Sequence, residues 1–399
     1  MKRTLALILA LLLTMSMVVG CGSKPAADDA GSADVAVEDN LQKSLAIDIS
    51  DVRGTDGRLL LEVQPAKDIP ARPEDPSALP ETDPLHWYDM EYAGMGEIDK
   101  SKVVKSPADG CIGKELYLIV TGDHPWTTAY IRGSEIAADA YGMKLTVLNP
   151  NYDLNVQNQM IDQAINARPD AIVIMFLDAE AAVQQARKVN EAGIPCFGST
   201  LQPPDAGMEY LVGYAGPDDF ANSANIANYM GEKAGGEGGI CYVTHLPGSS
   251  TYYGRFNRHQ AELAVNYPNI KTLDVASPGF DADATYQVVA DWITRFGDEL
   301  TMIYLADDSA QMTGAALACE DAGRSDIMIC AAGNSKVGMD TVKEGKATAI
   351  TEQSAEGGGA ISIRQCAEYF NGLDVAPMAL LPLGVIDASN VEEYYPAQW

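Results

Sequence analysis

His124, Pro125 and Trp126 bring an imidazole and an indole together at one point of the chain. They follow the apolar run 116–120 and precede a stretch of helical spacing, so the pattern places them where a strand turns into a helix. Three interpretations are open at this point: a catalytic base, an aromatic platform for a ligand, and a buried turn. The rest of the sequence has to decide between them.

The motifs of common enzyme chemistries are missing. The chain has four histidines, His86, His124, His245 and His259, and it lacks HExxH, GxSxG and the GxxxxGK phosphate loop. A lone histidine such as His124 needs a partnered nucleophile or acid to catalyse a reaction. We therefore expect a protein that is not an enzyme, with no catalytic residue and no cofactor.

One stretch hints at a metal site. Residues 281–287, DADATYQ, are rich in carboxylates, but a calcium loop needs more oxygen ligands, a turn glycine and a closing glutamate. The alternative is an acidic helix N-terminus in which Asp281 caps the helix and Asp283 faces its dipole. We expect this helix N-terminus, and no metal.

The composition excludes some partners. The 399 residues carry a net charge of −29, with 47% hydrophobic and 21% charged residues, which is typical of globular domains. Phosphate binding needs clustered Lys and Arg, so nucleic acid is not an expected partner. The six cysteines beyond Cys21 lack CxxC spacing and suit small buried hydrophobes better than a disulfide framework or a zinc site.

The first 21 residues resemble a lipoprotein signal. Lys2 and Arg3 precede an apolar run that is shorter than the roughly 20 residues of a membrane span. Val18-Val19-Gly20-Cys21 then resembles a bacterial lipobox, with Val18 where Leu is usual. The resemblance implies that Cys21 is lipidated and holds an extracytoplasmic protein on the membrane. The alternative is an ordinary secretory peptide followed by a chance cysteine.

Composition shifts divide the N-terminal quarter. We expect a lipoprotein signal peptide at 1–20, a flexible acidic tether at 21–45 and a Pro-rich, partly ordered arm at 46–111. The arm has enough aromatic residues to pack on a main domain, but its sequence indicates no function.

From residue 116 onward, strand-like and helix-like runs alternate. This alternation predicts an α/β protein with parallel sheets, and ten strands favour two doubly wound lobes over one sheet. Helices are expected at 126–141, 155–167 and 179–192, the second stopped by Arg168-Pro169. The expected strands are 116–121, 144–148, 171–176, 195–198, 210–214, 239–244, 272–276, 301–305, 327–331 and 348–353.

Ligands in open parallel sheets bind beyond the carboxyl ends of the strands. Residues 121–127, 198–202, 307–308 and 333–335 all occupy such ends in this pattern. We expect these segments to meet in one cleft.

The chain from about residue 114 onward resembles the ribose-type periplasmic sugar-binding proteins of ABC transporters. The motifs that carry the resemblance, in the family's order and spacing, are NVQNQMIDQAINARPDAIVI, VNEAGIP, LADDSAQMTGAALACEDAG and KVGMDTVKEGKATAITEQ. The resemblance implies two Rossmann-like lobes with a three-segment hinge, crossing near 215–218, 353–354 and 381–384. The N-terminal lobe would hold 112–216 and 354–382, and the C-terminal lobe 217–353 and 383–399.

The resemblance also implies a set of site residues. The family starts its first helix with Asn-Pro and two aromatics, where this chain has His124-Pro125-Trp126-Thr127, so Trp126 corresponds to the platform under a sugar ring. Phe280 corresponds to the opposing aromatic, Arg255 to a hydroxyl-binding arginine and Gln353 to the hinge glutamine. The full set of expected ligand-binding residues is Thr121, His124, Trp126, Thr127, Ser199, Thr200, Arg255, Phe280, Asp307, Asp308, Asn334 and Gln353.

The chain departs from the family at three of these places. Ser199-Thr200 replace an Asp-Arg pair common in pentose binders, Gly333-Asn334 replace a late Asp, and Thr127 replaces the second aromatic. The departures put ribose itself in doubt and favour a modified sugar, a cyclitol or a nucleoside.

Each of these site residues also fits a purely structural role. Asp308 aligns with the family's asparagine after the strand, or it caps a helix while Asp307 faces the cleft. Arg255 either binds a ligand hydroxyl or pairs with an acid. In a shifted alignment with the family, Arg258 would take its place. In their structural roles Trp126 starts a buried helix, His124 caps it, Gln353 bridges the hinge backbone and Phe280 lies in the core.

The function that the resemblance implies is capture of a small polar ligand by a monomer whose lobes close around it. The closed form would deliver the ligand to an ABC transporter permease. The alternative is a receptor subunit that passes the closed state to a membrane signalling protein.

Overall fold

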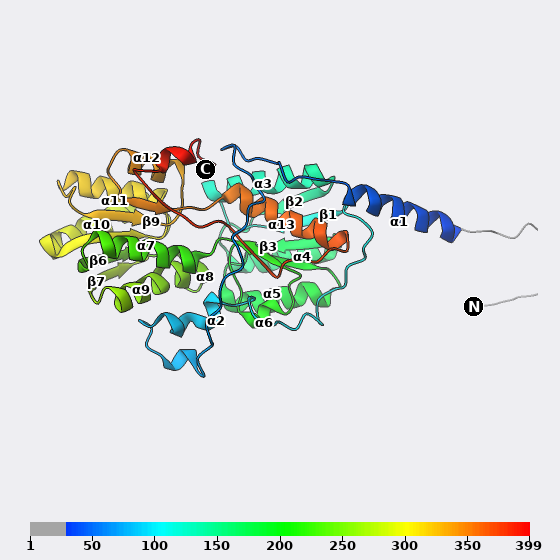
Figure 1. Ribbon diagram of the computed structural model, residues 1–399, viewed down its shortest axis with the longest axis horizontal. Coiled ribbons are helices and arrows are strands. Elements are labelled where there is room, and N and C mark those ends of the chain that lie inside the picture. Colours follow the sequence, from blue (N-terminus) through cyan, green and yellow to red (C-terminus); the bar gives the residue numbers. More distant parts are fainter. Residues whose placement is uncertain (1–28) are drawn as a thin grey trace, which may run out of the picture.

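Two six-stranded sheets organise the chain, and the computed structural model describes them within residues 29–399 (Figure 1). The signal peptide expected at 1–20 and the lipidation expected at Cys21 lie outside the described residues. The chain passes between the two sheets three times: between β5 and α7, between β10 and α13, and between β11 and β12.

The first sheet is parallel throughout. One face of the sheet is covered by the buried side chains of α3 (Pro125–Tyr141) and α13 (Ala355–Phe370). The other face is covered by those of α4 (Leu154–Ala167) and α5 (Ala179–Glu191). Its strands, in spatial order, are β11 (Met378–Leu380), β5 (Tyr214–Gly216), β4 (Cys196–Ser199), β3 (Ala171–Ile174), β1 (Glu115–Ile119) and β2 (Lys144–Leu148).

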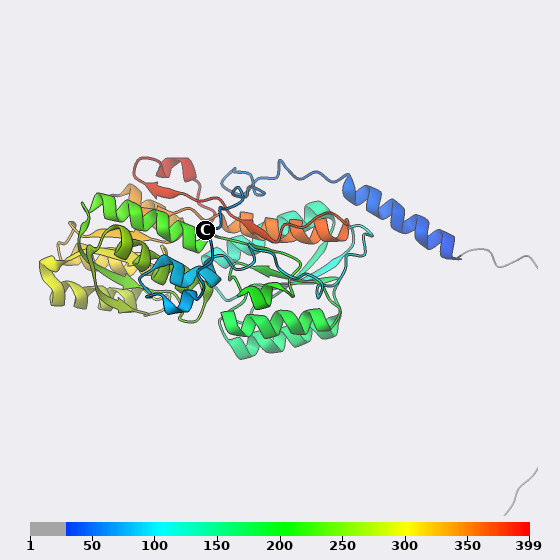
Figure 2. The same cartoon turned by 60° about the horizontal axis from the view of Figure 1, so that its bottom comes forward.

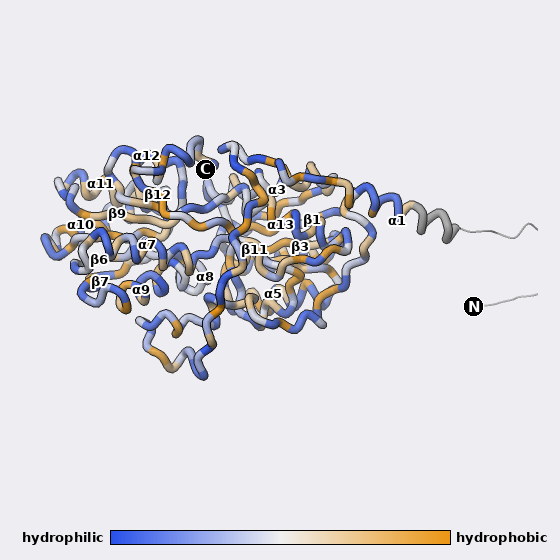
Figure 3. The backbone as a smooth tube through the Cα atoms, in the orientation of Figure 1, coloured by the Kyte–Doolittle hydropathy of each residue, from blue (hydrophilic) through white to orange (hydrophobic). Residues whose placement is uncertain are grey.

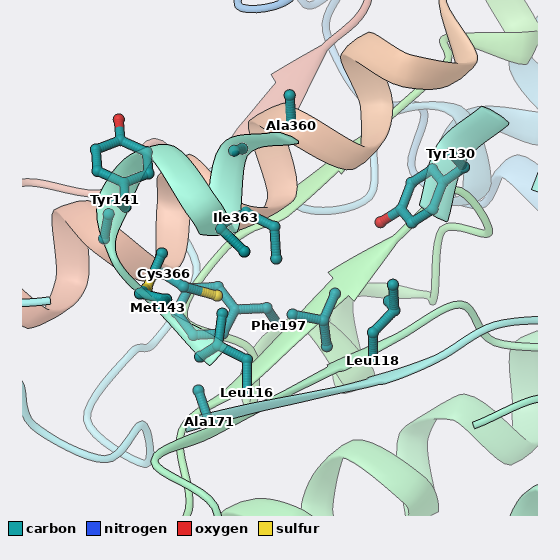
Figure 4. Close-up of a cluster of buried hydrophobic side chains, with 14 of the residues drawn as sticks. Leu116, Leu118, Tyr130, Tyr141, Met143, Ala171, Phe197, Ala360, Ile363 and Cys366 are labelled. Atoms are coloured by element: carbon teal, nitrogen blue, oxygen red, sulfur yellow. The ribbon is translucent and has the colours of Figure 1, made fainter. Parts of the chain in front are cut away.

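The core under α3 and α13 is continuous with the central strands of this sheet. Leu116, Leu118 and Phe197 project from the strands toward Ile363 and Cys366 of α13 (Figure 4). Strands that helices cover on both faces carry apolar residues on both faces. Figure 3 shows these hydrophobic residues in orange along the strands of both sheets.

The second sheet is parallel except at one edge. Its strands, in spatial order, are β12 (Val385–Asp387), β10 (Ala349–Thr351), β9 (Met328–Ala331), β8 (Leu300–Leu305), β6 (Glu237–Val243) and β7 (Asn269–Ala276). One face is covered by α10 (Ala282–Phe296), α11 (Ala310–Asp321) and α12 (Lys336–Lys343), the other by α7 (Asp219–Lys233) and α9 (Arg258–Asn266). The two lobes with mostly parallel sheets confirm the expected architecture; the one antiparallel pair is β10 with β12, which follows the third crossing of the chain.

Capping residues set the helix boundaries. Asp153 accepts hydrogen bonds from Asn155 N and Val156 N at the start of α4, which stops at Ala167 before Arg168-Pro169 as expected. Asp281 accepts from Ala284 N at 2.8 Å, so the acidic stretch 281–287 begins α10.

One predicted strand is wrongly placed. The apolar run 210–214 is a turn after the short helix α6 (Asp205–Met208), and β5 begins only at Tyr214. Leu211 is fully buried in the core with Met208. Val212 N donates to Cys196 O at 2.8 Å, so the run is already hydrogen-bonded to β4 just before β5 begins. The six described cysteines are all buried and none forms a disulfide.

Part of the segment expected to be a flexible tether is helical in the structure. Residues 29–45 form helix α1 (Asp29–Leu45), which projects from the first lobe (Figure 1). Its end is held on the body, because Asn40 Nδ2 donates to Asp109 O at 2.9 Å and Ser44 Oγ accepts from Ile112 N at 3.2 Å.

The arm, residues 46–111, touches both lobes. Its regular elements are the short turns η1 (Pro76–Ala78), η2 (Pro84–Trp87) and α2 (Tyr88–Glu91). Glu91 pairs with Arg258 of the second lobe at 3.0 Å, and Lys100 Nζ donates to Met208 O of the first lobe at 2.8 Å. No helix within residues 29–399 combines the length and apolarity needed to cross a membrane.

Candidate ligand-binding cleft

A cleft lies between the carboxyl ends of the two sheets, with about 680 Å³ of space when the open solvent at its mouth is included. Every lining segment follows a strand or lies in the hinge, as the rule for open parallel sheets requires, except the C-terminal residue Trp399. The lining residues are Thr121, His124, Trp126, Thr127, Tyr152, Met175, Leu177, Thr200, Leu201, Pro217, His245, Leu246, Ser249, Thr251, Arg255, Phe280, Asp307, Ala332, Gln353 and Trp399.

The first lobe presents the start of α3. His124 is the N-cap residue, and its Nδ1 accepts the backbone N–H of Trp126 at 3.1 Å. Pro125 occupies the first helical position, where a missing N–H costs nothing. The Trp126 ring stacks on Tyr130 with centroids 5.4 Å apart, which holds the indole at the cleft wall.

Tyr152 reaches the cleft from the loop after β2. A Cβ at Gly122 would lie only 2.3 Å from the Tyr152 ring, so a glycine is needed for the ring to cross the backbone there. Burial raises the pKa of Tyr152 to about 12, so its hydroxyl stays protonated and can donate a hydrogen bond.

The second lobe presents Arg255 on a π-helical turn, Tyr253–Asn257, between α8 (Ser250–Tyr252) and α9. Such turns widen a helix and recur at functional sites. Arg255 Nε donates to Asp219 Oδ1 at 2.8 Å and Nη1 donates to Ala306 O at 2.7 Å. These two bonds fix the guanidinium plane at the cleft.

His124 and Asp307 join the lobes across the cleft. Because Nδ1 of His124 accepts from Trp126 N, the neutral ring carries its proton on Nε2, which lies 3.4 Å from Asp307 Oδ1. Burial acts to raise the pKa of Asp307, but the contact with His124 and hydrogen bonds from Ser309 and Gln311 together hold it below its ordinary value. Asp307 is therefore an ionised acceptor held in place from both lobes.

An aromatic group surrounds Phe280. Its ring centroid lies 5.1 Å from that of His245, 5.5 Å from that of His124 and 5.9 Å from that of Tyr152. Burial, with the nearby charge of Arg255, lowers the pKa of His245 to about 3, so this imidazole is neutral at physiological pH.

The structure places nine of the twelve expected site residues on the cleft lining: Thr121, His124, Trp126, Thr127, Thr200, Arg255, Phe280, Asp307 and Gln353. Several of them combine the cleft position with the structural role that the sequence also allowed. His124 caps α3, Arg255 pairs with the acid Asp219, and Gln353 Nε2 donates to Asp219 Oδ1 at 3.2 Å.

The remaining three, Ser199, Asp308 and Asn334, do not line the cleft. Ser199 is fully buried and its hydroxyl bonds the Tyr130 hydroxyl at 2.7 Å. Asn334 Oδ1 accepts from Gln353 N at 3.0 Å. These contacts point both side chains into the protein.

Asp308 forms a hydrogen bond at the start of α12 instead. Its Oδ2 accepts from Ser335 N at 2.6 Å, and a Cβ at Gly338 would come within 1.9 Å of the same oxygen. Burial and the charge of Asp307 raise the pKa of Asp308 well above its ordinary value.

Sequence reasoning missed about half of the lining. His245, Ser249 and Thr251 follow β6, and the carboxyl-end rule applied to that strand would have found them. Trp399 gave no such signal, because it follows no strand. The remaining missed residues are Tyr152, Met175, Leu177, Pro217, Leu246 and Ala332, whereas Leu201 belongs to the segment 198–202 that was expected at the cleft.

The arrangement suits binding of a polar molecule that also has an apolar face. Aromatic rings cover C–H surfaces, while the hydroxyl, guanidinium, amide and carboxylate groups form directional hydrogen bonds. Within residues 29–399, no group of three or more His, Cys, Asp or Glu is placed to hold a metal ion.

The chain is similar in sequence to known binding proteins. The xylitol-binding protein of Mycolicibacterium smegmatis is 25% identical over 266 residues, which cover 65% of this chain and 73% of that protein. The ribose import binding protein of Escherichia coli is 24% identical over 261 residues, covering 64% and 84%.

Solved structures share the fold. An ABC transporter solute-binding protein from Bacillus halodurans with bound myo-inositol superposes with a TM-score of 0.67 at 21% identity, covering 72% of this chain and 99% of that one. A periplasmic solute-binding protein from Actinobacillus succinogenes with bound D-allose gives 0.65 at 20% identity, covering 70% and 100%.

The match that decides the family spans the two lobes. The model described as periplasmic binding protein domain covers residues 116–374, which is more than half of the chain. Periplasmic binding proteins bind their ligands without turnover, which agrees with the expectation that this protein is not an enzyme. This chain belongs to the periplasmic binding protein domain family.

Proposed function

We propose that this protein is a lipid-anchored, extracytoplasmic solute-binding protein that captures a sugar or sugar-like molecule and delivers it to an ABC transporter permease. The observation that carries the proposal is the cleft itself, in which aromatic rings and hydrogen-bonding groups from both lobes face one space. The relatives named for ribose and xylitol support the ligand class.

Capture by closure follows from contacts between the lobes. Besides the pair of His124 and Asp307, Gln202 N of the first lobe donates to Ser250 Oγ of the second at 2.8 Å. A ligand that touches both lobes stabilises this closed arrangement by its extra contacts relative to an open one. A permease then distinguishes loaded from empty protein by the lobe arrangement.

The ligand is expected to be uncharged. The positive charge of Arg255 is neutralised by Asp219. Among the other lining residues, only Asp307 has a carboxylate side chain. An uncharged polyol accepts and donates hydrogen bonds here without leaving an unpaired charge buried. Sugars, cyclitols and nucleosides all meet this condition.

Thermal unfolding of the chain lacking residues 1–21 tests the proposal. The panel is D-ribose, xylitol, myo-inositol, D-allose and uridine. A compound at 100 times its Kd adds about 2.7 kcal/mol, which raises Tm by a few degrees. A rise with one compound class supports the proposal and names the class, whereas protein shown to be ligand-free that responds to none of the panel contradicts it.

A further inference from the structure

The last residues of the chain enter the ligand-binding cleft. Trp399 lines the cleft, and its ring centroid lies 5.8 Å from that of His124. Its main-chain oxygen accepts from Lys336 N at 2.6 Å, where α12 of the second lobe begins. A Cβ at Gly333 would come within 2.9 Å of the indole, so this glycine leaves room for the ring. Figures 1 and 2 both show the C-terminal end at the junction of the lobes.

Gln398 anchors this end on the opposite side. Its Oε1 accepts from Glu356 N at 3.0 Å, and its backbone carbonyl accepts from Arg132 Nη2 at 2.5 Å, so both bonds reach the first lobe. Its Nε2 donates to Asp56 Oδ2 at 2.8 Å, which is a contact with the arm. The residue before the indole is thus held by groups from three parts of the chain.

The arm turn, residues 53–59, is itself tied to the hinge region. Thr55 N donates to Glu356 Oε2 at 2.7 Å, and Arg58 Nη1 lies 2.7 Å from Glu352 Oε1. Glu356 and Glu352 are both buried and flank the second crossing between the lobes. The turn therefore has a fixed position relative to Gln398.

We propose that Trp399 is a ligand-contacting residue and that the arm turn positions it, through Asp56 and Gln398. The proposal rests on the proposed function for its ligand class. It gives the arm a role in affinity: loss of the Asp56–Gln398 bond removes one of the restraints on the segment that carries the indole, and the ligand must then order that segment more fully at a cost in binding free energy. Asp56 and Gln398 act as positioning residues only.

A double-mutant cycle on affinity tests both halves. The probe is whichever of myo-inositol, xylitol and D-ribose gives the largest Tm shift with wild type, and Kd is measured by calorimetry. Trp399→Ala is expected to weaken binding at least about tenfold, and Trp399→Phe by less, because the aromatic face remains. Asp56→Ala is expected to weaken binding about threefold in wild type and not at all in Trp399→Ala.

Two outcomes overturn the proposal while the proposed function stands. One is wild-type affinity in Trp399→Ala. The other is an equal loss from Asp56→Ala in both backgrounds, since the arm would then act by another route. Asp51→Ala is the matched control, because Asp51 is an exposed acid of the same arm and its loss should leave Kd unchanged.

A spectroscopic readout tests the positioning step without any probe. The chain has four tryptophans, Trp87, Trp126, Trp292 and Trp399, so 5-fluorotryptophan labelling gives four fluorine resonances, and Trp399→Phe identifies one of them. Asp56→Ala should shift or broaden the Trp399 resonance and leave that of Trp292, buried in the second lobe, in place. An unchanged Trp399 resonance overturns the positioning role. If ligand-free wild type responds to none of the five compounds of the thermal panel, the proposed function fails, and this resonance still decides the positioning role.

Discussion

The residues of the cleft hold their polar groups in place before any ligand arrives. Arg255 is fixed by Asp219 and Ala306 O, and Asp307 is fixed by Ser309 and His124. Groups already oriented lose little freedom on binding, so their hydrogen bonds contribute more to affinity. The cleft therefore owes its selectivity to a few directional groups set among aromatic rings.

Trp126 carries the first prediction at this scale. Trp126→Ala should weaken binding of the compound found in the thermal panel at least tenfold, about 1.4 kcal/mol, because the indole covers the apolar face of the ring it contacts. Calorimetry measures Kd. Trp126→Phe is the control and should keep most of the affinity; equal affinity of Trp126→Ala and wild type would remove Trp126 from the site.

His259 carries a prediction about acid stability. The ring is fully buried, its Nδ1 lies 3.1 Å from the Tyr242 hydroxyl and it stacks on Tyr304 at 4.1 Å. Burial, with the charge of Arg258, lowers its pKa to about 3 from a usual 6.5. Below pH 6.5, His259 binds a proton in the unfolded chain but stays neutral in the folded protein. The free energy of unfolding therefore falls as pH falls toward 3.

The measurement is urea unfolding between about pH 6 and pH 4.5. His259→Phe removes this proton uptake, so the slope of the unfolding free energy against pH should become shallower by up to about 1.4 kcal/mol per pH unit. The comparison of slopes holds even if the variant is less stable overall. Parallel slopes for the two proteins would mean that His259 is protonated in the fold.

At the scale of elements, α3 and α13 approach each other more closely than ordinary side chains allow. A Cβ at Gly359 would lie 2.1 Å from the Tyr130 carbonyl oxygen, and one at Gly133 would lie 2.0 Å from the Glu356 carbonyl oxygen. This contact matters for the site, because α3 begins directly after His124 and α13 begins at the hinge.

Gly359→Ala is therefore expected to lower the free energy of unfolding by roughly 1 to 3 kcal/mol, since the nearest atom is a backbone oxygen and cannot rotate away. Gly358→Ala is the matched control on the same helix, where the nearest atom is 3.5 Å away on the Tyr130 ring. It should be neutral or stabilising by up to about 1 kcal/mol. Denaturant unfolding of both variants checks this, and equal destabilisation by the two would contradict the close approach.

At the scale of the whole molecule, the arm links the two lobes. It pairs Glu91 with Arg258 on the second lobe and Lys100 with backbone carbonyls of the first. An opening motion of the lobes must therefore stretch or release part of the arm.

The proposed lipid anchor belongs to this scale as well. Cys21→Ser should move the protein from the membrane pellet to the soluble fraction, because acyl chains contribute about 0.8 kcal/mol per buried CH₂ and a chain with a net charge of −29 is repelled by anionic lipids. Fractionation of expressing cells measures it. Cys319→Ser, a buried cysteine of α11, is the control and should remain in the pellet; a Cys21→Ser protein that also stays there would contradict lipidation at Cys21.

The sequence by itself determined the alternation of strands and helices, the two-lobed parallel architecture and most of the lining at the ends of β1 and β8. These features follow from local periodicity, capping residues such as Asp153, and the rule that places ligands beyond strand ends. The strands β11 and β12 escaped prediction because three residues carry too little periodicity.

Only the tertiary structure decided which of Asp307 and Asp308 faces the cleft and that Trp399 lies in it. Neighbouring residues after a strand point in different directions. Asp308 packs against Gly333 and Gly338, so Asp307 is the one that faces the cleft. Trp399 is held at the cleft by long-range bonds, its own with Lys336 and those of the preceding Gln398 with Asp56 and Glu356. Such long-range contacts leave no local pattern, because each depends on the positions of elements that the chain brings together only on folding.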